Sequence, residues 1–274
     1  MSRLPGNTQA SRGYAPVNDL NMYYEIEGTG DPLVYIPPAF GYAGVKSFPA
    51  LARIRSVITV DLQGHGRTAD IPERPITFEQ HARDVIGLLT HLGVSKADFF
   101  GESFGGVIAT LIAVRYPARV GRVATYAATF GPPPRAVKPE VLRPILAPAP
   151  DSRGIQFQKE HYQRVAPDPA YWPRIWEKVF DTQWGGFSTD ELTSITAPLL
   201  IALGDHDFVR LEHALETFKV IPKAELAVIP DAGHFVLFSE PEKVIPVVAH
   251  FLTKPEKALP LATAETGYHP GETR

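Results

Sequence analysis

Short apolar runs alternate along the chain with segments whose apolar residues recur at helical spacing. The segment HARDVIGLLTHLG (81–93) has helical spacing and ends in a glycine, whereas NMYYEIEG (21–28) alternates as a strand does. Six further runs have the length and apolar content of buried strands: PLVYIPP (32–38), SVITVD (56–61), KADFFG (96–101), RVATYAATF (122–130), APLLIALGD (197–205) and AELAVIP (224–230). Strands that alternate with helices predict an α/β fold, with a mostly parallel central sheet and helices on both faces.

The alternation lapses between residues 131 and 193. This segment is rich in proline at its start and in aromatic residues later, and it holds all three tryptophans. It predicts an insertion that sits on the sheet. In a chain of 274 residues we therefore expect one elaborated domain. Its expected parts are an N-terminal arm (1–16), a core (17–130 and 194–254), the insertion (131–193) and a C-terminal tail without apolar periodicity (255–274).

The predicted strand that ends at Phe100 is followed by GESFGG (101–106), after which the chain resumes with helical spacing. Residues 101–105 fit the pattern G-x-S-x-G in a strand-turn-helix context, where a nucleophilic serine sits on a tight bend. Glycines without a Cβ let the strand and the helix approach each other while the serine hydroxyl projects outward. The alternative is that Ser103 only caps the helix, since serine is a good N-cap.

A serine hydroxyl is a weak nucleophile and needs a base within hydrogen-bond reach, usually a histidine oriented by a carboxylate. Among nine histidines, His234 lies in a loop after the last predicted strand, where it would meet the serine turn. His65 and His206 also lie in loops near that edge. The carboxylate should follow another strand, and the segment LGDHDFV (203–209) offers Asp205 and Asp207.

At this point the sequence resembles the α/β-hydrolase fold family over nearly its whole length. The resemblance rests on GESFGG, on DLQGHGRTAD (61–70), on GDHDFV (204–209) and on DAGHF (231–235), in the chain order serine, aspartate, histidine. It implies Ser103 as nucleophile, His234 as base and Asp207, rather than Asp205, as the orienting acid. By the same resemblance, the insertion is expected to be a helical cap over the serine.

The resemblance also implies an oxyanion hole, with one departure from the family pattern. Many members carry His-Gly after the early strand, whereas this chain has Pro37 and Pro38. Proline has no N–H, so neither residue can donate a hydrogen bond. The expected donors are the backbone N–H groups of Ala39 and Phe104.

Aromatic residues of the predicted cap are candidates for the substrate pocket. We expect Phe40, Trp172, Trp176 and Trp184 to line it, which would favour an apolar, ester-like substrate. Trp172 and Trp176 are four residues apart and would share one face of a helix. The alternative is that this face only docks the cap onto the sheet domain.

Composition narrows the class of protein. The chain is 44% hydrophobic with a formal net charge of −3, it has no long basic run, and it has no cysteine. These features argue against a nucleic-acid partner and exclude disulfides and a cysteine nucleophile. We find no apolar stretch of signal-peptide or membrane-span length, so we expect a cytoplasmic protein that needs no cofactor and no membrane partner.

Two other segments contain residues typical of a metal site or of a dinucleotide site. Residues 205–207 (DHD) could ligate a metal, but no second cluster of metal-binding residues supports a site with three ligands, so we expect no metal. Residues 64–69 (GHGRTA) match G-x-G-x-x-A, with Asp84 near the place of a ribose-binding acid. That motif must open a helix, and Pro72 and Pro75 follow too closely, so we do not favour a dinucleotide enzyme.

The sequence therefore predicts a serine hydrolase that cleaves a carboxylic ester or lactone through an acyl-enzyme. The same three residues could instead serve amide cleavage, C–C bond hydrolysis of ring-cleavage products, or perhydrolysis. A protein that keeps the fold but binds a ligand with slow turnover is the alternative outside enzymes.

Overall fold

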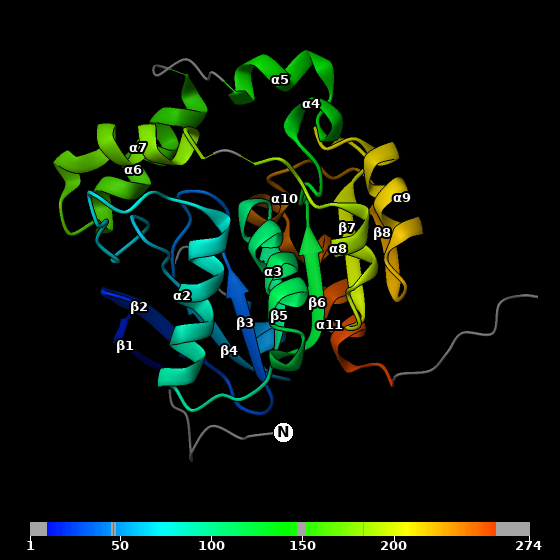
Figure 1. Cartoon of the computed structure of the whole chain (residues 1–274), viewed down its shortest axis with the longest axis horizontal. Coiled ribbons are helices and arrows are strands. Elements are labelled where there is room, and N and C mark those ends of the chain that lie inside the picture. The colour runs from blue at the N-terminus through cyan, green and yellow to red at the C-terminus, as the bar shows by residue number, and fades with distance from the viewer. Residues whose placement is uncertain (1–9, 45, 47, 147–151, 183, 256–274) are drawn as a thin grey trace, which may run out of the picture.

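The computed structural model describes residues 10–44, 46, 48–146, 152–182 and 184–255 (Figure 1). Within them, eight strands form one sheet in the order β1-β2-β4-β3-β5-β6-β7-β8. From β4 to β8 all neighbours are parallel, while β2 runs antiparallel to β1 and β4. The strands are β1 (Ser11–Val17), β2 (Leu20–Glu27), β3 (Pro32–Ile36), β4 (Ser56–Val60), β5 (Ala97–Glu102), β6 (Val120–Tyr126), β7 (Leu199–Gly204) and β8 (Ala224–Ile229). The predicted α/β fold with a mostly parallel sheet is confirmed.

The N-terminal segment corrects one expectation. Residues 11–16, which we assigned to an arm, form β1 together with Val17 and pair with β2 through a tight turn at Asn18 and Asp19, both of which have positive φ. β1 is an edge strand, where a proline such as Pro16 is tolerated because one side of the strand needs no ladder hydrogen bonds. Its sequence, SRGYAPV, is too polar and proline-containing to have predicted a strand. The expected C-terminal tail lies outside the described residues, apart from residue 255.

Two hydrophobic cores cover the two faces of the sheet, and alternate residues of each central strand feed opposite cores. In β3, Val34 and Ile36 face one core, whereas Leu33 and Tyr35 face the other. This period of two is the expected geometry of a strand that is buried on both sides. The first core is completed by α2 (Phe78–His91), α3 (Phe104–Arg115), α8 (Thr189–Thr193) and α9 (Leu211–Val220), and the second by α1 (Pro49–Ala52), α10 (Val236–Ser239) and α11 (Ile245–Thr253).

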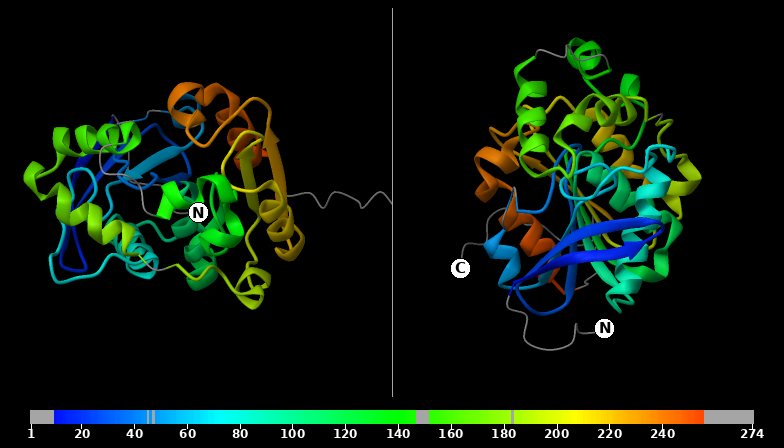
Figure 2. Two further views of the ribbon diagram at one scale, coloured as in Figure 1. Left: turned by 90° about the horizontal axis from the view of Figure 1, so that it is seen from above. Right: turned by 90° about the vertical axis from the view of Figure 1, so that its left-hand side faces the viewer.

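Residues 131–193, which we call the insertion, add α4 (Pro133–Ala136), α5 (Pro139–Leu146), α6 (Arg153–Val165), α7 (Trp172–Phe180) and α8. Figures 1 and 2 show α4 to α7 stacked beyond the ends of the central strands, while α8 returns to the face of the sheet. The arrows of the parallel strands point toward this end, so the insertion lies over the carboxyl edge of the sheet. Ligands of open α/β sheets bind at that edge.

Polar contacts between α7 and the loop after β4 fix one side of the insertion. Lys178 Nζ lies 2.6 Å from Oδ2 of Asp70 and also donates to the carbonyl of Ile71, while the Tyr171 hydroxyl donates to Asp70. Ile175 approaches Gly64 so closely that a Cβ on that glycine would lie 2.0 Å from the Ile175 Cδ1 atom. The two elements are therefore joined by an ion pair and by close packing.

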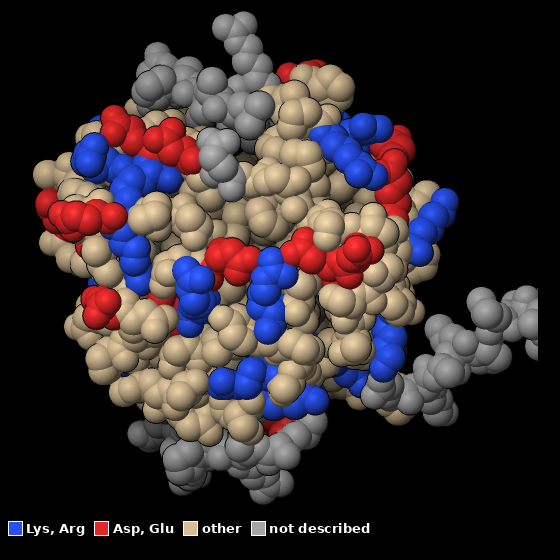
Figure 3. Space-filling model, in the orientation of Figure 1, with Lys and Arg blue, Asp and Glu red and all other residues tan. Residues whose placement is uncertain are grey.

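Charged residues of both signs are interspersed over the face shown in Figure 3. Arg115 of α3, for example, pairs with Glu79 at 2.8 Å and with Glu191 at 2.6 Å, which links α2, α3 and α8. Exposed pairs of this kind add little stability, typically about 0–1 kcal/mol. In the part of the chain that is described, no helix has both the length and the apolar character required to cross a membrane.

Candidate active site

Ser103 sits on a strained turn between β5 and α3. Its backbone has φ +51° and ψ −114°, a conformation that is rare for a residue with a side chain. The two glycines that flank it have no room for a Cβ. A Cβ on Gly101 would lie 2.3 Å from the Gly105 carbonyl oxygen, and a Cβ on Gly105 would lie 2.0 Å from the Ile36 carbonyl oxygen. Ser103 does not cap the helix with its side chain. The turn therefore holds the hydroxyl away from the backbone.

Ser103, His234 and Asp207 form one hydrogen-bonded chain. The Nε2 atom of His234 lies 3.0 Å from Oγ of Ser103, and its Nδ1 lies 2.9 Å from Oδ1 of Asp207. Because a carboxylate can only accept, Nδ1 carries the proton and donates to Asp207, which leaves the Nε2 lone pair to accept the serine proton. The structure thus brings together the three residues that the sequence singled out, in the geometry of a Ser-His-Asp triad.

The loop after β7 separates its two aspartates. Asp207 is 1% exposed, and its Oδ1 also accepts from the backbone N–H of Val209. Asp205 is instead exposed and accepts from the N–H of Ala232, which ties it to the loop that carries His234. This backbone hydrogen bond lowers the pKa of Asp205. Asp207 is therefore the acid that orients His234, and Asp205 braces the loop.

His234 is also held by its neighbours. The Phe208 ring stacks on the imidazole at 3.8 Å between centroids. The hydroxyl of Tyr126, at the end of β6, donates to the carbonyl of Gly233 at 2.7 Å. His206, the other histidine of the acid loop, has a side chain that is 73% exposed and lies 3.9 Å from Asp205, so it takes no part in the triad.

The two expected oxyanion donors belong to a turn after β3 and to the start of α3. Ala39 is the second residue of a turn closed by a hydrogen bond from the Gly41 N–H to the Pro38 carbonyl, and it lines the same cavity as Ser103. Phe104 is the first residue of α3, where a helix leaves its backbone N–H unpaired. Phe40, the third residue of the turn, has φ +59°, which is strained for a bulky side chain. Pro37 and Pro38 thus lead into a turn in which Ala39 lines the cavity.

A cavity of about 720 Å³ opens above Ser103 and His234. Its wall is largely phenylalanine: Phe40, Phe157, Phe180, Phe208, Phe235 and Phe238. Apart from the triad, its polar side chains come from α6 and its N-cap, and no described residue that lines it is a carboxylate. Phe40 is thus placed as the sequence predicted, whereas Trp172, Trp176 and Trp184 are not among the described lining residues.

The tryptophans pack against other aromatic rings instead; Trp172 is buried, whereas Trp176 and Trp184 are partly exposed. Trp172 and Trp176 contact each other at 5.7 Å, which confirms that they share one face of α7, but that face lies against Phe40. Trp184 packs against Phe78 of α2 at 4.8 Å. The contacts of Trp172 and Trp176 with Phe40 favour the docking alternative for the face that they share, and Trp184 also packs on the sheet domain. Their indole rings hold the insertion on the sheet domain, and phenylalanines from both parts form the cavity wall.

One buried polar cluster beside the nucleophile was missed by sequence reasoning. Glu102, next to Ser103, forms an ion pair with Lys46 and accepts a 2.7 Å hydrogen bond from the Tyr35 hydroxyl. Both charged side chains are less than 5% exposed, and the Lys46 ammonium also lies 3.7 Å from the centre of the Phe238 ring. Burial lowers the pKa of Lys46 and raises that of Tyr35. Nothing in the sequence pairs Glu102 with a residue 56 positions away.

The GHGRTA segment forms turns and does not open a helix, since the next helix, α2, begins only at Phe78. Asp84 is engaged by Arg74 at 2.8 Å and by Asn18 and Gln80, so it is not free to bind a ribose. His65 is completely buried, and its Nδ1 bonds to the carbonyl oxygen of Gln63, so it is not part of the hydrogen-bonded chain from Ser103 to Asp207. The dinucleotide interpretation is therefore not supported by the structure.

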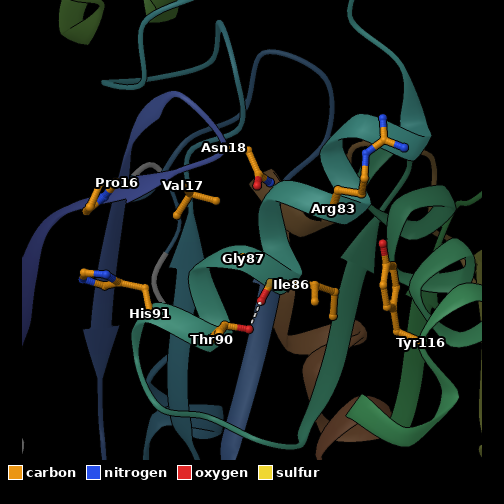
Figure 4. Close-up of a pocket in the computed structure, with 9 residues that line it drawn as sticks. All are labelled: Pro16, Val17, Asn18, Arg83, Ile86, Gly87, Thr90, His91 and Tyr116. Atoms are coloured by element: carbon orange, nitrogen blue, oxygen red, sulfur yellow. Dashed lines mark hydrogen bonds between the residues drawn. The ribbon is translucent and has the colours of Figure 1, made fainter.

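A second hollow lies away from the triad, where the turn after β1 meets α2 (Figure 4). It is a shallow groove whose walls include Val17, Asn18, Arg83 and Tyr116. Its one hydroxyl on α2, that of Thr90, donates to the Ile86 carbonyl of the same helix. Among the described lining residues there is no paired nucleophile and base, so the cavity above Ser103 is the candidate active site.

Comparison with known proteins identifies relatives of the chain. Residues 28–247 match the family model described as "Alpha/beta hydrolase family". The dihydrolipoyllysine-residue acetyltransferase component of the acetoin cleaving system of Pseudomonas putida is 27% identical over 91% of this chain and 72% of its own length. The 2-hydroxy-6-oxononadienedioate/2-hydroxy-6-oxononatrienedioate hydrolase of Burkholderia vietnamiensis is 25% identical over 86% of this chain and 92% of its own. A solved structure of an N-acyl homoserine lactone degrading enzyme superposes with a TM-score of 0.71 at 25% identity, over 88% of this chain and 100% of that one.

Proposed function

Because the chain belongs to the alpha/beta hydrolase family, we propose that it is a serine hydrolase that cleaves carboxylic esters or lactones through an acyl-enzyme. The observation that carries the proposal is the continuous hydrogen-bonded chain from Ser103 through His234 to Asp207 at the floor of an apolar cavity. A serine so placed needs no further activator, since the imidazole can take its proton as the oxygen attacks.

The chemistry follows from the positions of the three side chains. Oγ of Ser103 attacks the substrate carbonyl carbon while its proton passes to Nε2 of His234, and a tetrahedral intermediate forms. The protonated ring then gives that proton to the leaving alkoxide, the C–O bond breaks, and the acyl group stays on Ser103. Water, deprotonated by the same ring, attacks the acyl-enzyme and releases the acid and the free serine. In a lactone the alcohol and the acid leave as one molecule.

Each partner of the serine has a distinct electrostatic role. Asp207 fixes the tautomer of His234 and stabilises the imidazolium that forms during attack. The backbone N–H groups of Ala39 and Phe104 are proposed to bind the oxyanion, and they carry no cost of reorganisation because the turn and the helix already fix them. Loss of one such donor typically costs about 10²–10³ in kcat.

The cavity favours an apolar acyl or alcohol group as the substrate's recognition element. Its phenylalanine wall and lack of described carboxylates offer mainly hydrophobic contact. Burial of roughly 100 Å² of apolar substrate surface would contribute about 2.5 kcal/mol. A volume of about 720 Å³ lies within the range of sites that enclose a small organic ligand. We therefore propose bulky apolar or aromatic esters and lactones as the substrate class.

C–C bond hydrolysis is a second candidate, because the Burkholderia vietnamiensis relative carries the name of a hydrolase of ring-cleavage products and aligns over most of both chains. A substrate panel separates the two candidates. Purified protein should be offered aryl esters of increasing acyl size, an N-acyl homoserine lactone and a vinylogous 1,5-diketone acid of the ring-cleavage type. Our proposal expects kcat/KM to be at least tenfold higher for the preferred ester or lactone than for the diketone, and the reverse order would favour C–C hydrolysis.

A further inference from the structure

Five aromatic rings form a continuous column behind the candidate oxyanion hole. In order they are Phe104, His65, Phe40, Trp176 and Phe180. Successive centroids lie 6.0, 5.7, 6.1 and 4.2 Å apart, and the first three pairs are within 26° of parallel. The column runs from the first residue of α3 to the last residue of α7, so it joins the nucleophile turn to the insertion.

The two oxyanion donors are attached to this column. Phe104 carries one donor on its own backbone, and Phe40 follows directly on Ala39, which carries the other. Among the described residues, His65 is the one ring that contacts both phenylalanines, since it lies between them. The strained φ of Phe40 shows that its backbone is held by its surroundings rather than by its own preference.

The position of His65 is also fixed by a hydrogen bond in the plane of its ring. It is completely buried, and its Nδ1 lies 2.8 Å from the carbonyl oxygen of Gln63, to which it must donate. Its Nε2 has no hydrogen-bond partner among the described residues. The edge of the ring faces His81, at 5.9 Å between centroids, and Asp70 and Arg74 are the nearby charged groups. One hydrogen bond therefore anchors a ring whose other described contacts are the two stacked phenylalanines and the edge contact with His81.

We propose that His65 is a positioning residue for the oxyanion hole, which sets the separation of the Ala39 and Phe104 N–H groups by stacking between Phe40 and Phe104. This inference rests on the proposed function. A residue with this role touches neither substrate nor the triad, yet a shift of about 1 Å in a donor can cost as much as 10²-fold in rate. Its effect should therefore fall on kcat and on oxyanion binding rather than on substrate affinity.

Two substitutions separate the ring from its hydrogen bond. His65→Phe keeps a flat ring between Phe40 and Phe104 but loses the donor to Gln63. His65→Asn keeps an N–H donor at a similar place but removes the ring. The matched control is Val248→Ala in α11, which removes buried volume from the core on the other face of the sheet. All three should be compared with wild type in kcat, in KM and in the affinity for a trifluoromethyl ketone, whose hydrated or serine-bound form places an oxyanion in the hole.

We expect His65→Asn to lower kcat by roughly tenfold to a hundredfold with KM changed less than about threefold, and to weaken the trifluoromethyl ketone by a similar factor. His65→Phe should recover most of the loss. Val248→Ala should lower the melting temperature but leave kcat within about twofold at a temperature where it is folded. If His65→Asn keeps wild-type kcat and inhibitor affinity, or if Val248→Ala at equal destabilisation loses as much kcat, the inference is wrong while the proposed function stands. Absence of turnover in the wild type would overturn both.

Discussion

Asp207 holds His234 through a 2.9 Å contact between its Oδ1 and Nδ1 of the ring, whereas Asp205, two residues earlier, accepts from the Ala232 backbone. Two acids of one short loop thus have different tasks. One orients the base, and the other braces the loop in which that base lies.

Asp207→Asn is therefore expected to lower kcat by about 10³–10⁴, because the amide no longer stabilises the imidazolium and can impose the wrong tautomer on His234. Asp205→Asn retains an oxygen that can accept from Ala232, so its loss should stay below about tenfold. Steady-state kinetics on one activated ester compare the two. Equal losses, or a larger loss for Asp205→Asn, would move the orienting role to Asp205.

Phe157 of α6 tests whether the insertion sets selectivity. It lines the cavity and is half exposed, so Phe157→Ala removes apolar contact for large substrates at little cost in packing. We expect KM for a naphthyl ester to rise roughly fivefold, equivalent to about 1 kcal/mol, with the acetate nearly unchanged. Phe187→Ala is the control, since Phe187 packs on Trp184 and Phe130 away from the cavity. Parallel changes for both substrates would show that Phe157 is merely structural.

Gly105 should tolerate no side chain. A Cβ there would lie 2.0 Å from the Ile36 carbonyl oxygen and 2.6 Å from that of Pro37, and both are backbone atoms that cannot swing away. Gly105→Ala is expected to reduce the free energy of unfolding by more than about 3 kcal/mol, or to prevent folding. Gly185→Ala, where no atom would lie within 4 Å of the new Cβ, should change it by less than about 1 kcal/mol. Chemical denaturation measures both, and a stable, active Gly105→Ala would contradict the packing of the turn.

Burial of His65 makes a prediction about acid stability. The pKa of this group falls from 6.5 to about 4 in the folded protein, because burial penalises the charged ring. Between these values the unfolded chain binds a proton that the folded chain does not. The free energy of unfolding is therefore unaffected by His65 above pH 6.5 and decreases by about 3 kcal/mol as the pH falls toward 4. Burial raises the pKa of the Asp61 carboxyl to about 7, so this group makes the free energy of unfolding change with pH in the opposite direction. Each variant must therefore be compared with wild type at the same pH.

Replacement of His65 by Phe removes the group that titrates. The stability of His65→Phe relative to wild type should therefore rise by about 3 kcal/mol between pH 7 and pH 4 in denaturant titrations. His91→Gln is the matched control, because His91 is exposed at the end of α2. A difference between His65→Phe and wild type that stays constant over this pH range would show that His65 is not held neutral.

The sequence was sufficient for most of the sheet and for Ser103 and His234, because these depend on local signals, whereas the choice of Asp207 over Asp205 came from the family resemblance. Apolar runs bounded by turn residues define the strands, and the spacing of Gly101 and Gly105 reflects a turn that only glycine can make. The carboxyl ends of parallel strands meet at one edge, so loops distant in the chain are expected to converge there. The sequence did not predict β1, because an edge strand needs no apolar run and can contain a proline.

The cavity wall could not be predicted in the same way. Trp172 and Trp176 share a helix face, as their spacing indicates, but spacing does not say whether that face meets a cavity or another ring. That outcome depends on how α7 docks, through Lys178 and Asp70 and through the approach of Ile175 to Gly64. The Glu102–Lys46 ion pair and the column of five aromatic rings that includes His65 likewise join segments far apart in the chain. No local sequence pattern predicts such contacts.

The central claim, that Ser103 is the nucleophile of a hydrolase, is tested most directly by covalent labelling. Purified protein is treated with a fluorophosphonate, and the modified peptide is identified by mass spectrometry, with Ser103→Ala and Ser152→Ala treated in parallel. Ser152 is the matched control because it lines the same cavity, whereas the described hydrogen bonds of the His234 ring go to Ser103 and Asp207. We predict that wild type and Ser152→Ala are labelled at Ser103 alone and that Ser103→Ala is neither labelled nor active, although it stays folded. Labelling at another serine, or near-normal ester turnover by Ser103→Ala, would contradict the claim.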